Sequence, residues 1–201
     1  MLSFRSYLKE KTESTNPVSV DVYHGSGRHF SKFDQKMARL PNDFYGGGVA
    51  YFTDDHDVAK TYAKSMSKET KTPHIYHTSL KMNNVFDVNH SFHGDKLKKI
   101  LPKDTEKFAT SAGILNAGNA DQKYHILGKL ERGETPLTGH QVFWGLSHGG
   151  TKTTEARNHL IKHGYDGLRY NGGLMVPGSK KHNVYIPYNS DSINIKHISK
   201  I

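Results

Sequence analysis

The 201-residue sequence contains no cysteine. This absence excludes disulfide bonds, thiolate nucleophiles and zinc sites with cysteine ligands, and it is compatible with a reducing compartment. The sequence also lacks an apolar run of the roughly 18 residues needed to cross a bilayer. Charges at Arg5, Lys9 and Glu10 interrupt the N-terminal segment, so a signal peptide is not expected either. We therefore expect a cytoplasmic protein with no membrane partner.

Hydrophobic residues are scarce, at 34% of the chain, but aromatic residues make up 10% and tyrosine outnumbers phenylalanine. This composition is typical of a folded domain with many polar-tipped rings rather than of a disordered tail. The formal net charge is +9 at pH 7. An anionic partner would satisfy that charge, whether nucleic acid, a nucleotide or an acidic protein surface, and so would a solvated basic surface.

The pattern along the chain divides it into an N-terminal peptide and linker, 1–17, and a single domain, 18–201. Alternating or apolar stretches predict strands, and helices are expected where apolar residues recur at helical spacing. The expected strands are 18–26, 49–53, 74–80, 84–88, 165–170, 184–188 and 192–198. The expected helices are one starting near Asp57 and capped by Asp54 or Asp55, a mainly helical stretch 95–132, and 154–163 closed by Gly164. Residues 133–150 are expected to form a loop around Trp144. This order favours a mixed α+β fold.

Three stretches combine residues that suit chemistry. The first is Val22-Tyr23-His24-Gly25-Ser26, a histidine at a strand end beside a turn. The second, Gly48 to Asp54, contains Tyr51 and leads into a helix that carries Tyr62. The third is the corner Gly164-Tyr165-Asp166-Gly167-Leu168 with the later strand 183–188.

Taken together, these stretches resemble the ADP-ribosyltransferase family in its His-Tyr-Glu branch, which includes diphtheria toxin and the poly(ADP-ribose) polymerases. The likeness extends to domains of bacteriophage polyvalent and head proteins, and it runs from about residue 20 to about residue 196. It implies a split β-sheet core with flanking helices, and NAD+ as the substrate.

The resemblance also implies the roles of the site residues. His24 would hold the adenine-side ribose, Gly25 would bond the carboxamide and Ser26 would assist at the ribose. Tyr51 and Tyr62 would lie on either side of the nicotinamide ring. The chemistry agrees, because a flat cationic ring needs π faces and a glycine lets backbone approach closely. The alternative for the two tyrosines is that they are ordinary half-buried core residues.

One position departs from the family. The family's glutamate, which stabilises the oxocarbenium-like transition state, is replaced here by Val184. Elongation of poly(ADP-ribose) is therefore not expected, and relatives with an aliphatic residue here include both mono-ADP-ribosyltransferases and inactive proteins. Among other acids, Asp166 is interpreted as a turn residue and Glu155 as a surface residue of a first helical turn.

Other ligand motifs are set aside. His74 and His77 should point to opposite faces of a strand, and His90 and His93 have no evident acidic partner, so no metal site is expected. The stretch 173–180 has Ser-Lys instead of Lys-Ser and a proline, so it is not interpreted as a phosphate loop. The basic residues 179–182 would contact a phosphate or an acceptor molecule, or remain solvated.

The N-terminal peptide MLSFRSYLKE resembles the capsid-targeting peptides of internal head proteins in T-even-type bacteriophages. That resemblance implies cleavage after Glu10, packaging with DNA inside the virion and later entry into the host cytoplasm.

The function expected from the sequence is therefore mono-ADP-ribosyl transfer from NAD+ to a host protein or nucleic acid, with His24 and Tyr51 as the catalytic residues. Val184 keeps open a protein that binds NAD+, ADP-ribose or nucleic acid without turnover. A basic internal head protein that binds DNA or blocks a host defence factor is the other alternative.

Overall fold

The structure is a computed structural model that describes residues 17–34, 45–67, 72–115, 120–174 and 180–201. It has the predicted mixed α+β architecture, with a seven-stranded sheet in the order β4-β7-β8-β2-β1-β3-β9. The strands of this sheet are β1 Val18–Ser26, β2 Phe52–Thr53, β3 His74–Met82, β4 Val85–Asp87, β7 Gly167–Asn171, β8 Asn183–Pro187 and β9 Ile193–Lys200. Neighbouring strands are antiparallel except the parallel pair β4 and β7.

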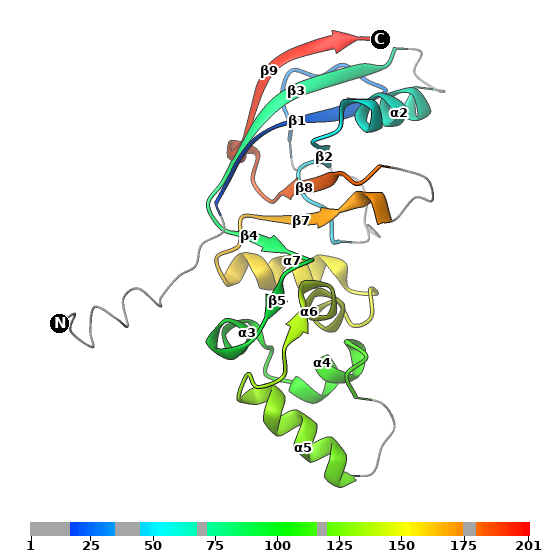
Figure 1. Cartoon of the computed structure of the whole chain (residues 1–201). Coiled ribbons are helices and arrows are strands. Elements are labelled where there is room, and N and C mark those ends of the chain that lie inside the picture. Colours follow the sequence, from blue (N-terminus) through cyan, green and yellow to red (C-terminus); the bar gives the residue numbers. More distant parts are fainter. Residues whose placement is uncertain (1–16, 35–44, 68–71, 116–119, 175–179) are drawn as a thin grey trace, which may run out of the picture.

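The helices lie in two places. In Figure 1, α2 lies beside β1 and β3, whereas α3 to α7 are grouped at the end of the sheet formed by β4 and β7. The bounds are α2 His56–Met66, α3 Gly94–Ile100, α4 Thr105–Ser111, α5 Ala120–Glu131, α6 Gly139–Leu146 and α7 Thr153–Lys162. Short strands β5 Ser91–Phe92 and β6 Leu137–Thr138 pair with each other, and single 3₁₀ turns lie at Gly172–Leu174 and Ser190–Ser192.

The main sheet is joined at its centre by very few residues. Strand β2 pairs with β1 only through Tyr23 and Thr53, and with β8 through Phe52–Tyr185 and Thr53–Val184. By contrast, β1 pairs with β3 along its whole length. The two halves of the sheet are therefore connected through a two-residue strand, which is the physical basis of the predicted split core.

The buried hydrophobic residues form two clusters. One contains Val22 of β1, Phe52 of β2 and Tyr76 of β3, together with Tyr185 of β8 and with Phe33 from the loop after β1. The other cluster packs α3 to α7 against β4, β7 and β8 and includes the fully buried Phe86 and Phe108. Burying one such phenylalanine stabilises the fold by about 1.5–3 kcal/mol.

The prediction of a loop over 133–150 is wrong, because residues 139–146 form α6. The Thr138 side chain accepts from the Gln141 backbone N–H, and the Gln141 side chain accepts from the Thr138 N–H, which is a capping box. Gly139 and Gly145 of this helix are both packing positions. A Cβ on Gly145 would lie 2.5 Å from the Phe108 ring.

The other predicted elements are present with shifted ends. The helical stretch 95–132 is confirmed as α3, α4 and α5. Helix α3 ends at Ile100, and the following Leu101 is extended, as expected for a residue that precedes proline. Helix α7 is followed by Gly164 with a φ of 83°, as its role in ending a helix requires. The strand predicted over 49–53 is shorter, since only Phe52 and Thr53 form β2.

Candidate functional site

The candidate site lies where the two halves of the sheet separate. Beyond the Tyr23–Thr53 pair, β1 continues through Ser26 with β3 on one side, and within the described residues no strand pairs with its other edge. Backbone N–H and C=O groups on such an edge can bind a ligand. His24, Gly25 and Ser26 all lie on this stretch.

His24 is held in place by a hydrogen bond to the segment that precedes β2. Its Nδ1 lies 2.8 Å from the carbonyl oxygen of Tyr51, which precedes β2. A carbonyl oxygen only accepts, so Nδ1 carries the proton and donates it. In the neutral ring, Nε2 is then an acceptor, so a ribose hydroxyl would donate to His24 rather than accept from it.

The surroundings keep this imidazole neutral. The ring of His24 lies 5.3 Å from that of Phe33, 5.6 Å from that of Phe52 and 6.0 Å from that of Tyr76. Burial among these rings lowers the pKa of His24, and the hydrogen bond to Tyr51 opposes this only in part. At neutral pH the side chain is therefore an uncharged, oriented hydrogen-bonding group.

Tyr51 and Val184 belong to the same packed region. Tyr51 is partly buried and packs against the cluster that contains Val184. Val184 is 8% exposed and is paired with Thr53 on one side and Tyr170 on the other. The position that the resemblance assigns to the family's glutamate is thus occupied by a buried aliphatic side chain.

Gly25 allows helix α2 to lie directly on β1. A Cβ at this position would lie 2.7 Å from the Ala63 nitrogen and 2.9 Å from the Ala59 carbonyl carbon, and closer still to the Ala59 carbonyl oxygen. Real Cβ contacts do not reach these distances, so any side chain would push the helix away. The packing of α2 therefore requires glycine at position 25, in addition to the proposed contact of Gly25 with a carboxamide.

Helix α2 carries the second tyrosine of the motif. The side chain of Asp55 caps the helix by accepting from the N–H groups of Asp57 and Val58, at 2.8 and 3.1 Å. Tyr62 is 54% exposed, and its side chain is therefore open to a ligand. Ser26 has a local partner, because its Oγ accepts from the Arg28 N–H at 3.1 Å.

Asp54, the other cap candidate, has a different role. Its Oδ1 accepts from the Asn183 backbone N–H at 2.8 Å, and its Oδ2 accepts from Asn183 Nδ2 at 2.7 Å. Both carboxylate oxygens thus hold the first residue of β8, immediately before Val184. The sequence predicted Asp54 near the start of a helix. Its contact with Asn183 was not predictable from the sequence, because it depends on the pairing of β2 with β8.

Asp166 and Glu155 each have a partner away from the motif residues. The carboxylate of Asp166 accepts from the backbone N–H groups of Asn83 at 2.6 Å and Asn84 at 3.1 Å, so it holds a turn. Glu155 is exposed and forms an ion pair with Lys152 at 2.9 Å. Neither residue lines the open pocket beside the site.

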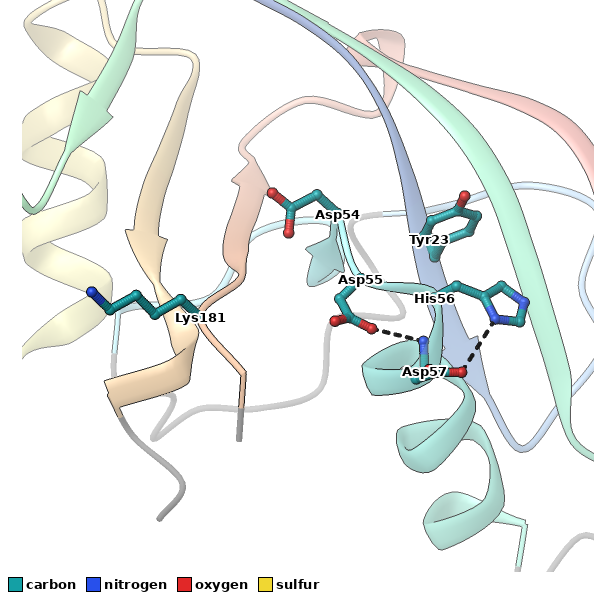
Figure 2. A pocket seen from close by; sticks show the side chains of 6 residues that line it. All are labelled: Tyr23, Asp54, Asp55, His56, Asp57 and Lys181. Atoms are coloured by element: carbon teal, nitrogen blue, oxygen red, sulfur yellow. Dashed lines mark hydrogen bonds and ion pairs between the residues drawn. The ribbon is translucent and has the colours of Figure 1, made fainter. Parts of the chain in front are cut away.

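An open pocket of about 560 Å³ adjoins the site. Figure 2 shows Tyr23 and His56 side by side on the right of the pocket and Lys181 on its opposite side, with the aspartates between them. The lining residues are Tyr23, Asp54, Asp55, His56, Asp57 and Lys181. His24, Tyr51, Tyr62 and Val184 do not line it. Sequence reasoning gave no role to Tyr23 or His56, although Tyr23 lies in the first of the three motif stretches.

Comparisons with solved structures gave two weak likenesses. A chain from the crystal structure of the M. tuberculosis MbcT-MbcA toxin-antitoxin complex is 10% identical, with 92% of this chain and 85% of that chain covered and a TM-score of 0.44. An anti-CRISPR protein is 13% identical, with 94% and 97% covered and a TM-score of 0.32. At these TM-scores neither likeness carries an argument. A comparison with curated proteins gave no match.

Within the described residues, no helix is long and apolar enough to span a bilayer. The family match is more informative than the structural likenesses. Residues 16–199 match the family described as ADP-ribosyltransferase in polyvalent proteins. The match covers the split sheet, the unpaired edge of β1 at His24, Gly25 and Ser26, and both flanking groups of helices. This chain belongs to the family of ADP-ribosyltransferases in polyvalent proteins.

Proposed function

We propose that this protein transfers a single ADP-ribose unit from NAD+ to a host macromolecule. Family membership implies NAD+ as the substrate and a transferase reaction. The observation that carries the proposal is the hydrogen bond between His24 and Tyr51, because it connects the two halves of the split sheet at the edge where the family motif lies.

In this proposal each motif residue has a defined role. The nicotinamide ring lies between Tyr51 and Tyr62, with its carboxamide against the backbone of Gly25, and Ser26 assists at the ribose. A ribose hydroxyl donates to Nε2 of His24. The bond between ribose C1′ and the nicotinamide nitrogen breaks with its electron pair on the nitrogen, so neutral nicotinamide leaves.

The acceptor completes the reaction. Its oxygen or nitrogen attacks C1′, and the proton that it loses passes to solvent, since Val184 provides no base. The transition state has positive charge on the sugar, and without a glutamate it is less stabilised. Slow transfer of one unit, rather than elongation of a polymer, is therefore expected.

The proposal is tested by incubating the protein with labelled NAD+ and host lysate, and measuring both released nicotinamide and labelled macromolecules. Tyr51→Ala should abolish both signals. Tyr124→Ala is the matched control, because Tyr124 is 73% exposed on α5, away from the cleft. No release and no labelling, with equal NAD+ affinity for the parent and Tyr51→Ala, would exclude the proposal.

A second candidate is a protein that binds NAD+ or ADP-ribose without turnover, and the buried Val184 favours it. Calorimetry would then detect NAD+ binding while no nicotinamide appears. Val184→Glu should create hydrolysis, whereas Val184→Gln, with the same shape and no charge, should not. Circular dichroism of both variants establishes that the glutamate is tolerated.

A role inside a virion rests on the N-terminal peptide, which lies outside the described residues. In that case Glu10 is the last residue removed, and the mature chain travels with packaged DNA before it enters the host cytoplasm. Mass spectrometry of the protein from purified virions would detect a chain that starts at Lys11. A chain in virions that still begins at Met1 would contradict cleavage.

A further inference from the structure

A row of four aromatic rings lies outside the residues assigned to NAD+. We call His56, Tyr23, His77 and His197 the ring row. The Tyr23 ring is 5.2 Å from His56 and 5.1 Å from His77, both edge to face, and His77 stacks on His197 at 3.7 Å with an interplanar angle of 22°. Each ring therefore contacts the next.

The sheet register produces this arrangement. Tyr23 on β1 is directly opposite His77 on β3, which is directly opposite His197 on β9. Residues that face each other across antiparallel strands point to the same side of the sheet. His56, the first residue of α2, extends the row at its Tyr23 end.

Burial distinguishes the ring row from a core. His56 and His197 are exposed, and Tyr23 and His77 are only partly buried. His74, three residues before His77, contacts His29 instead, so the prediction that these two histidines point to opposite faces is confirmed. The described residues hold no group of three metal-ligating side chains, and the ring row has no acidic member.

Three lysines lie near the row, two on α2 and one on β9. Lys60 and Lys64 follow His56 by one and two turns of α2, so they lie on its side of the helix. Lys196 precedes His197, and its Nζ lies 2.6 Å from the Asp21 carboxylate, two residues before Tyr23. Asp21 is thereby paired, so Lys60 and Lys64 are the cations along the α2 side of the row. The His56 end is acidic instead, because Asp57 lies 3.8 Å from His56 and Asp54 and Asp55 line the adjoining pocket.

The histidines of the row are also suited to stacking when neutral. Burial lowers the pKa of His77, and the neighbouring His197 and His56 lower it further. An uncharged imidazole can stack on a planar ring, as His77 does on His197. Exposed aromatic side chains on a sheet, with cations along their flanks, are the combination that binds bases and phosphates of single strands.

We propose that the ring row is a stacking surface for the bases of a single-stranded nucleic acid, whose phosphates contact Lys60 and Lys64. Tyr23 and His56 also line the pocket next to the cleft (Figure 2), so a bound strand would lead toward the candidate site. Single-stranded nucleic acid is then the class of acceptor. That last step rests on the proposed function, whereas the binding itself does not.

The test is the fluorescence anisotropy of a labelled oligothymidylate and of a duplex of the same length, each titrated with the full chain at low and moderate salt. The parent should bind the single strand more tightly than the duplex. Tyr23→Leu and His197→Ala should each weaken single-strand binding by about fivefold or more, while Tyr23→Phe retains it. Lys60→Gln with Lys64→Gln should reduce the dependence on salt.

The control is Tyr124→Leu, which removes an exposed ring far from the row and should bind like the parent. Circular dichroism establishes that Tyr23→Leu is folded, and His197→Ala, at an exposed edge-strand position, provides a second measurement. Equal affinity for duplex and single strand, or unchanged binding by both variants, would overturn the proposal.

Failure of the proposed function gives a different result. If the parent releases no nicotinamide but binds oligothymidylate through the ring row, the transferase proposal fails and the binding surface stands. If His197→Ala still releases nicotinamide from NAD+ and has lost the oligonucleotide, both stand.

Discussion

Replacing Gly25 by alanine should destabilise the protein strongly, because α2 packs directly on this residue. The added Cβ would lie 2.7 Å from the Ala63 nitrogen, while ordinary van der Waals contact begins at 3.4 Å. The neighbouring atoms are helix backbone, so no flexible side chain can move aside. The helix must instead shift by roughly 1 Å, and overpacking of this kind costs about 1–3 kcal/mol.

Rigid backbone neighbours place Gly25→Ala at the upper end of this range, a loss of about 3 kcal/mol in the free energy of unfolding. Urea denaturation followed by circular dichroism measures it. The same shift moves Tyr62 with α2, so NAD+ affinity should fall as well.

Gly128→Ala is the control for the glycine-to-alanine change itself. Gly128 lies in α5, and its only close neighbour would be the end of the Arg132 side chain at 3.2 Å. This variant should be more stable than the parent by about 0.5–1 kcal/mol, since alanine favours helix. If Gly25→Ala unfolds within about 0.5 kcal/mol of the parent, the packing of α2 on β1 is not as described.

Three further changes test the fold around the site. Asp55→Ala removes the cap of α2 and should cost about 1 kcal/mol in urea denaturation; no loss would mean that Asp55 does not cap. Phe108→Ala empties a fully buried site and should cost about 3–5 kcal/mol in the same assay; a cost below 1 kcal/mol would contradict its burial. The pKa values of His24 and His77 are lowered in the folded chain, so the unfolded chain binds protons first as the pH falls through about 6.5. Unfolding free energy measured at pH 7.5 and 5.5 should therefore decrease toward the lower pH, and an increase would contradict buried neutral histidines.

Local patterns predicted β1 and α2 well. The alternating stretch 18–26 forms β1, and the helix expected near Asp57 forms α2, because period and capping signals are properties of neighbouring residues. The helix 139–146 was not predicted. The glycine at position 145 is explained by tertiary packing, since Gly145 lies against Phe108 on another helix.

The candidate site was less predictable, because its partners come from distant segments. The motif identified His24 and Tyr51, but only the folded chain shows the Tyr51 carbonyl as the acceptor that selects the tautomer of His24. The hydrogen bonds between Asp54 and Asn183 depend on strand order, and so does the stacking of His77 on His197. No spacing along one segment encodes the order of strands in a sheet.

The most direct test of this account is a crystal structure of the protein soaked with NAD+. We predict nicotinamide between the rings of Tyr51 and Tyr62, and a ribose hydroxyl within hydrogen-bond distance of His24 Nε2. NAD+ bound elsewhere, with no contact to His24, Gly25 or Ser26, would contradict this account.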